Sequence, residues 1–436
     1  MRTEDGRIGS ALAAATCALL GTTAIAPVRA QEIKRWELDS ALMYYGESEG
    51  RVQDLSASML ARRDFDDDRF LSLDLTLDTL TGASPSGATA LGRPQTFTSP
   101  SGAAVYSTPA GEIPLDDTFL DSRVALGVSW SQPLARLYTV STGLGFSKEY
   151  DYIHLGANAS LARDFNQRNT TLSAGVAFST DDIDPVGGKP QALSMMGDVG
   201  DLSNRGGSDS KDILDLLVGV TQVINRTTIV RFNYSYSDAS GYLSDPYKIL
   251  SVVDPLTGDT LLRIPAPGTT GPTGVYRFES RPDTRSKQAF YAELKKYFGG
   301  KVLDVSWRFM SDDWGIDSQT LEGRLRWPVG VSSFIEPHAR YYTQGAADFY
   351  RISLVAGQAA PQFASADSRL GEFDGVTVGL KFGHKTRSGN EWSARLEYYM
   401  QSGSVDSAAL IGSQNNFNQL PDLDAIIAQF GYSFSL

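Results

Sequence analysis

Three histidines follow the first thirty residues: His154, His338 and His384. Their spacing matches no metal-binding pattern, and the chain contains one cysteine, Cys17, near its start. No Gly-x-Ser-x-Gly nucleophile elbow is present. We therefore predict that the protein is not an enzyme and holds no cofactor. His154 and His338 are expected to line a polar interior, and His384 is expected in a turn.

Clustered carboxylates are the second group that could do chemistry. Asp181, Asp182 and Asp184 form one cluster, and a similar one lies within residues 312–317. Calcium prefers several oxygen ligands of this kind. Because neither cluster has the full spacing of a calcium loop, we predict no metal site. The first three residues remain weak calcium candidates beside the simpler interpretation of solvated charge.

Charged side chains recur at every second position in the second half of the chain. Alternation places them on one face of successive strands. The set expected to line an interior constriction is Arg308, Arg324, Arg326, Arg340, Glu293, Glu322, Glu336, Arg395 and Glu397. The corresponding face of the first half is smooth, with small or neutral residues across 139–160. Two outcomes are open: a charged, water-filled pore, or a lumen closed by pairing of opposite charges.

Strands must present these residues, and the alternation is clear at two places. Within the expected strand from Phe70 to Leu80, leucines at positions 71, 73, 75 and 77 alternate with polar residues at 72, 74, 76 and 78. From Ile426 to Leu436, every even position is apolar or small. This period of two is typical of a strand whose faces meet different environments.

Links between the expected strands alternate in length. The links 81–118, 181–211, 239–283 and 345–372 are long and polar. All of these long links belong to one alternating set, and every link of the other set is short. Outer-membrane barrels have short periplasmic turns and long external loops. The sequence therefore predicts an all-β fold, a single antiparallel up-and-down transmembrane β-barrel of about sixteen strands. An even number of strands puts both termini on the periplasmic side.

Bulk composition agrees with this fold. The 436 residues carry a formal charge of −12, which argues against a nucleic-acid partner. After residue 30 no apolar run is long enough for a membrane helix. Residues 1–30 read as a signal peptide, with an apolar run over 8–25 and small residues around a cut after Ala30. The expected domains are this signal peptide and a barrel over 31–436.

Several motifs resemble those of known outer-membrane proteins. The C-terminal strand, with Gln429, Gly431, Phe434 and Leu436, resembles the closing-strand signal that the barrel-assembly machinery reads, although Leu436 stands where Phe is usual. Residues 80–85, Leu-Thr-Gly-Ala-Ser-Pro, resemble a motif of an uncharacterised domain-of-unknown-function family of Gram-negative outer-membrane β-barrel proteins. Residues 44–52 resemble that family's N-terminal stretch of Tyr, acidic residues and Arg-Val.

The family resemblance implies a barrel in the outer membrane. Members lie near small lipoproteins, thioredoxin-like proteins and flavin-attaching enzymes, which implies periplasmic lipoprotein or redox partners. From the residues themselves, Thr81, Gly82, Ser84 and Pro85 read as a turn that anchors loop 81–118. That loop would either fold into the lumen as a plug or simply follow a strand-ending turn.

These observations predict an integral barrel in the bilayer of a Gram-negative outer membrane. The expected function is a passive or semi-selective channel for small polar solutes. The alternative is a closed barrel that acts as a membrane scaffold for periplasmic redox or lipoprotein components.

Overall fold

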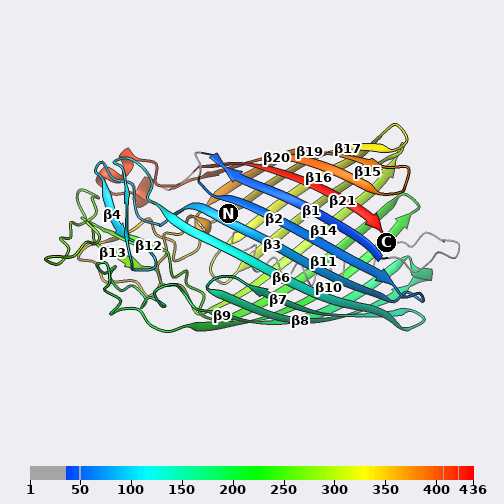
Figure 1. Cartoon of the computed structure of the whole chain (residues 1–436), viewed down its shortest axis with the longest axis horizontal. Coiled ribbons are helices and arrows are strands. Elements are labelled where there is room, and N and C mark those ends of the chain that lie inside the picture. The colour runs from blue at the N-terminus through cyan, green and yellow to red at the C-terminus, as the bar shows by residue number, and fades with distance from the viewer. Residues whose placement is uncertain (1–35, 49–50, 406, 421) are drawn as a thin grey trace.

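The computed structural model describes residues 36–48, 51–405, 407–420 and 422–436. Sixteen antiparallel strands form one closed barrel, which confirms the predicted fold class and strand number (Figure 1). In ring order the strands are β1 (Trp36–Glu47), β2 (Gln53–Asp64), β3 (Phe70–Pro85), β6 (Leu115–Ala135), β7 (Tyr138–Lys148), β8 (Tyr152–Phe165), β9 (Thr170–Ile183), β10 (Asp209–Asn225), β11 (Thr228–Gly241), β14 (Thr284–Phe298), β15 (Lys301–Asp312), β16 (Asp317–Val329), β17 (Ser333–Gln344), β19 (Phe373–Lys385), β20 (Glu391–Gly403) and β21 (Leu423–Ser435).

The barrel closes where β21 pairs with β1. Leu38 stands opposite Phe434, and Leu42 stands opposite Phe430. The backbone N–H of Leu436 donates to the carbonyl of Trp36 at 2.8 Å, so the first described strand begins where the chain ends. Closure satisfies the backbone groups of both edge strands, as a membrane-spanning sheet requires.

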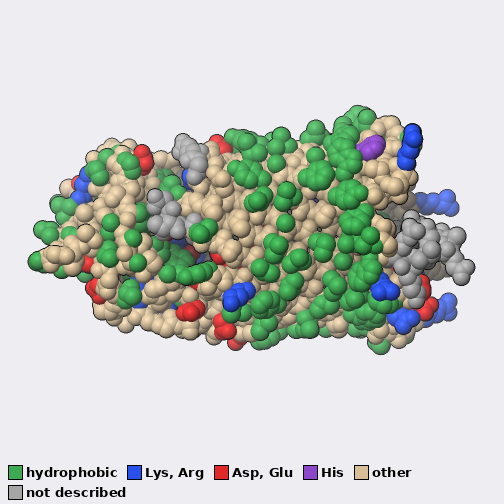
Figure 2. Space-filling view, viewed as in Figure 1, with side chains coloured by type: hydrophobic (Ala, Val, Ile, Leu, Met, Phe, Trp, Pro, Cys, Tyr) green, Lys and Arg blue, Asp and Glu red, His purple; other side chains and the backbone are tan. Residues whose placement is uncertain are grey.

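Large apolar side chains point away from the barrel axis and remain exposed. Leu144 in β7 is 62% exposed and Phe430 in β21 is 51% exposed, and similar residues recur on almost every barrel strand. Figure 2 shows these side chains spread over the barrel surface. Such an apolar exterior faces lipid, while alternate residues face the interior. No helix among the described residues is long and apolar enough to span a membrane.

Long links gather at one end of the barrel and short turns at the other (Figure 1). The links 65–69, 136–137, 166–169, 226–227, 299–300, 330–332 and 386–390 are short, and they lie at the end where β1 starts. At the opposite end the described residues of 86–114, 184–208, 242–283, 345–372 and 404–422 form a folded body, here called the cap. The phase of link lengths thus follows the predicted topology.

The cap has its own strands, short helices and core. Its strands are β4 (Gln95–Thr98), β5 (Val105–Thr108), β12 (Ile249–Val253), β13 (Tyr276–Phe278) and β18 (Ser353–Val355). Its 3₁₀ helices are η4 (Ser368–Leu370), η5 (Ser407–Ala409) and η6 (Gly412–Asn416), and η3 (Asn166–Arg168) lies in a turn at the other end. Phe97 is fully buried, with its ring centroid 4.6 Å from that of Tyr276. The two small sheets pack through this apolar cluster.

The turn predicted at residues 81–85 is wrong. Strand β3 continues to Pro85 and pairs with β6 through a bulge between Gly82 and Ser84. Pairing of β3 with β6 continues beyond residue 82 because the bulge accommodates the backbone of Gly82, whose φ is 132°. The loop that follows β3 is part of the cap at the barrel mouth and does not form a plug within the lumen (Figure 1).

Candidate functional site: the lumen and its vestibule

The inner face of strands β14 to β20 carries a dense row of charge. All nine charged residues predicted for the constriction alternate with outward apolar neighbours such as Trp307, Leu321, Tyr341 and Leu396. Several of them also line internal cavities. The period-two pattern holds here because lipid on one side and water on the other select opposite side-chain types.

Many of these charges pair along the wall. Arg324 lies 2.6 Å from Glu322, and His338 lies between Glu322 at 3.3 Å and Glu397 at 2.9 Å. Arg395 lies 3.6 Å from Glu397 and so continues the network. These contacts, within and between strands β16, β17 and β20, keep the charges on the wall.

A second part of the wall is paired differently. Glu293 binds Arg231 of β11 at 3.1 Å. Glu336 lies beside Lys381 in the strand register. Arg326 has its guanidinium carbon 3.5 Å from the centroid of the Phe334 ring and also approaches Glu391 at 3.6 Å. Arg326 therefore stacks against the wall near the short-turn end.

Arg308 and Arg340 differ from this pattern. Both are exposed although they belong to the inner face. Among the described residues neither has a carboxylate within 4.0 Å. Each lies over a tyrosine ring, Arg308 at 5.7 Å from Tyr291 and Arg340 at 6.0 Å from Tyr342. A guanidinium that is exposed and has no such counter-charge is stabilised by hydration.

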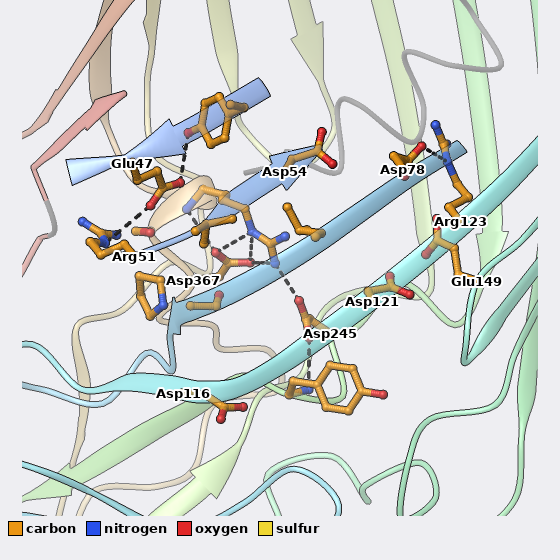
Figure 3. Close-up of a pocket in the computed structure, with 18 of the residues that line it drawn as sticks. Glu47, Arg51, Asp54, Asp78, Asp116, Asp121, Arg123, Glu149, Asp245 and Asp367 are labelled. Atoms are coloured by element: carbon orange, nitrogen blue, oxygen red, sulfur yellow. Dashed lines mark hydrogen bonds and ion pairs between the residues drawn. The ribbon is translucent and has the colours of Figure 1, made fainter. Parts of the chain in front are cut away.

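Two cavities lined by described residues matter for this site. The larger, here called the vestibule, has a volume of about 930 Å³ and lies between the cap and the barrel wall; its lining includes Glu47, Asp54, Asp121, Arg340 and Arg369 (Figure 3). The smaller has a volume of about 240 Å³ and is lined by residues that include Tyr291 and Arg308. Glu322 and Arg324 border both cavities, so the two spaces adjoin.

The calcium candidates do not converge on a common point. Asp181 faces inward, where it accepts a hydrogen bond from the hydroxyl of Tyr152 and lies 2.6 Å from Nδ1 of His154. Asp182 is exposed on the other face of the strand, and Asp184 lies beyond its end. Successive side chains of a strand point to opposite faces, so these carboxylates do not gather into the calcium site that their closeness in sequence suggested. No group of three His, Cys, Asp or Glu residues in the described part of the chain could hold a metal ion.

The histidines lie at three separate places. His154 and His338 face the lumen. His384 lies within the last residues of β19 and contacts the hydroxyl of Ser333 at 2.9 Å, so the turn expected for it is wrong. The strand extends two residues further than the pattern suggested, because His384 pairs with Ser333 of β17 and Lys385 pairs with Glu391 of β20.

The Ser84–Pro85 segment is held by a lysine that sequence analysis missed. The ammonium group of Lys248, in the cap, donates to Oγ of Ser84 at 3.0 Å and to the carbonyl of Pro85 at 2.6 Å. Gly82 packs so closely on the backbone of Arg51 that a Cβ would lie 1.9 Å from its carbonyl oxygen. Thr81 pairs with Gln53 in the sheet. The end of β3 therefore ties the cap to the barrel.

Lys248 lies within a buried charge network of the cap. Nε of Arg281 is 2.6 Å from Glu279, its Nη2 is 2.8 Å from Asp367, and Arg369 reaches Asp245 at 2.6 Å. Burial lowers the pKa of Lys248 and raises that of Glu279 to about 7. A lysine next to the apolar run 249–253 was the only sequence signal for this network.

The closed ring, the apolar exterior and the charged interior define an integral β-barrel of the outer-membrane type. The chain belongs to the family described as "Protein of unknown function (DUF3570)", whose model matches residues 9–434. No curated protein sequence matches the chain.

Three solved structures of other proteins are similar to this chain at low sequence identity. A bacterial polysaccharide outer membrane secretin is 9% identical, with a TM-score of 0.43, covering 92% of this chain and 98% of the other. CdiB from Acinetobacter baumannii is 8% identical, with a TM-score of 0.46, and this chain spans 61% of its length while 93% of this chain is covered. OccK5 (OpdH) from Pseudomonas aeruginosa is 8% identical, with a TM-score of 0.39 and coverage of 92% and 98%.

Proposed function

We propose that the protein is a passive or semi-selective channel for small polar solutes in the outer membrane of a Gram-negative bacterium, with both termini in the periplasm. The observation that carries this proposal is the exposure of Arg308 and Arg340 to two adjoining cavities. A closed, dry interior would require an ion-pair partner for each guanidinium. The other seven predicted charges would set the field around the path.

Planar-bilayer recording of the purified barrel in KCl tests the channel directly. We expect steady single-channel conductance. The double variant Arg308→Glu with Arg340→Glu reverses two charges on the path and should shift the reversal potential toward cation selectivity. Arg387→Glu, in an exposed turn between β19 and β20, is the matched control and should leave selectivity unchanged. A folded preparation without conductance would contradict the channel.

A closed scaffold for periplasmic lipoprotein or redox components is the second candidate. It is favoured by the folded cap over the mouth and by the pairing of Arg324, Glu322, His338 and Glu397 along the wall. Chemical cross-linking in native membranes, followed by recovery of this barrel, should then capture one periplasmic partner in a fixed ratio. Steady conductance together with no captured partner would contradict the scaffold.

The C-terminal strand is proposed as the signal for the barrel-assembly machinery. Phe434 and Leu436 belong to its outward face, whereas Gln429 and Gly431 belong to the inward face. The double variant Phe434→Ala with Leu436→Ala should lower the yield of folded, heat-modifiable barrel in the outer membrane. Ser435→Ala is the matched control. An unchanged yield would contradict this role.

A further inference from the structure

The vestibule has two walls of opposite charge. Strands β1 to β7 and their links to the next strands contribute seven carboxylates to its lining and two guanidiniums. The carboxylates are those of Glu47, Asp54, Asp78, Asp116, Asp121, Glu149 and Asp151. Figure 3 labels six of these residues: Glu47, Asp54, Asp78, Asp116, Asp121 and Glu149. This wall is therefore strongly acidic.

The facing wall carries the basic groups. Strands β16, β17 and β20 contribute three guanidiniums and two carboxylates to the same lining, together with the imidazole of His338. Strand β6, which carries Asp121, is fourth in the ring of sixteen, and strand β17, which carries Arg340, is thirteenth, so these two residues stand nearly across the barrel from each other. The two walls meet on one side, where only β21 separates β20 from β1. Arg340 is exposed on this basic wall and has no carboxylate within 4.0 Å among the described residues.

Aromatic groups and volume further restrict the ligand. Seven tyrosines line the vestibule: Tyr45, Tyr150, Tyr152, Tyr242, Tyr247, Tyr342 and Tyr399. Phenol rings contact apolar and peptide groups and also attract cations. A volume of about 930 Å³ lies at the upper end of the range of ligand sites, about 300–1,000 Å³. The space accepts a molecule with two charged ends and a short body between them.

We propose that the vestibule selects zwitterions, specifically short peptides with a free amino terminus and a free carboxylate terminus. The amino group would face Asp54 and Asp121, and the carboxylate would face Arg340. A purely anionic solute would meet the acidic wall, and a purely cationic solute would meet Arg340, so each would lose one favourable contact. This inference rests on the proposed channel function and specifies its substrate class.

Liposome swelling with triglycine and its uncharged analogue, N-acetyl-triglycine amide, tests the inference. We expect triglycine to enter about threefold faster, an effect of the size that one or two hydrated ion pairs produce. Arg340→Gln, and separately Asp54→Asn with Asp121→Asn, should bring the two rates together. Arg387→Gln and Asp68→Asn, which make the same chemical changes in short turns at the far end, should preserve the difference.

The outcomes separate the two proposals. Equal rates for the two peptides in a barrel that still conducts KCl would overturn the zwitterion inference and leave the channel standing. If a folded preparation showed no swelling and no conductance, both the channel proposal and the zwitterion inference would be overturned. A rate difference that survives in both vestibule variants would show that selection lies elsewhere, and would likewise overturn the inference.

Discussion

The barrel and the cap place their apolar side chains in opposite ways. In the barrel, Leu144 and Phe430 point outward and stay exposed. In the cap, Phe97 and Tyr276 are buried against each other. The same chain follows both rules because the barrel is surrounded by lipid and the cap by water. Exposure of an apolar residue is therefore informative only when the surrounding solvent is known.

The two regions also treat charge differently. The barrel wall leaves Arg308 and Arg340 exposed to the lumen, whereas the cap buries Arg281 completely between Glu279 and Asp367. The two barrel arginines keep their exposure to solvent, whereas ion pairs with Glu279 and Asp367 stabilise the buried Arg281. The following substitutions test this contrast between the regions.

The largest expected effect comes from the lysine that joins them. Lys248→Met keeps the volume of the side chain but leaves Asp367 and its neighbours without one cation, which we expect to cost about 4 kcal/mol of cap stability. Hydrogen exchange in peptides from 86–114 and 242–283 should accelerate. Heat-modifiable migration of the barrel should persist, and Lys385→Met in an exposed position should change neither. Loss of the barrel as well would contradict a separable cap.

Two phenylalanines sharpen the comparison directly. Phe97→Ala removes a fully buried ring and should cost about 3 kcal/mol, measured as faster exchange of the cap core. Phe430→Ala removes a ring that lipid surrounds, so its cost should be smaller, measured by urea unfolding of the barrel in vesicles. Equal costs would show that both rings share one kind of environment.

Introducing an arginine on the outer face of the barrel, and separately on the surface of the cap, tests whether the two surfaces meet different solvents. Leu144→Arg puts a cation near the middle of an outward strand face and should destabilise the barrel by about 3 kcal/mol in vesicles. Leu256→Arg, on the cap where the side chain is 86% exposed, should change stability little. Tolerance of the arginine at residue 144 would contradict the lipid-facing assignment of that strand face.

The smallest expected effect is a pH dependence confined to the cap. Burial raises the pKa of Glu279 to about 7 from an ordinary 4.5, so its contribution is full below about pH 4.5 and is lost as pH rises to 7. We expect cap stability to fall by about 2 kcal/mol over that range. Hydrogen exchange, corrected for the intrinsic rate, measures the change.

Asp367 has the opposite dependence. Although burial favours its protonated form, Arg369, Lys248 and Arg281 hold the pKa of Asp367 below its ordinary value. Its contribution is present above about pH 4 and is lost as pH falls. The cap should thus be most stable near pH 4–5. Glu279→Gln should remove the slope between pH 5 and 7, and a slope that remained would assign it to another group.

Much of the barrel could be predicted because its signals are local. Alternation across 70–80 and 426–436 and the phase of link lengths fixed the strand number and the inward row from Glu293 to Glu397. The predicted signal peptide, residues 1–30, lies outside the described residues. The cap could not be predicted, because Phe97 meets Tyr276 and Lys248 meets Ser84 only through contacts between distant loops.

The sequence by itself determined which side chains face lipid and which face the lumen, since period two needs no knowledge of strand neighbours. Only the tertiary structure decided which inward charges are paired. Glu322, His338 and Glu397 come from three strands whose register brings them together, while Arg308 and Arg340 have no carboxylate partner within 4.0 Å among the described residues. Pairing depends on distances across strands and loops, and a linear pattern does not encode those distances.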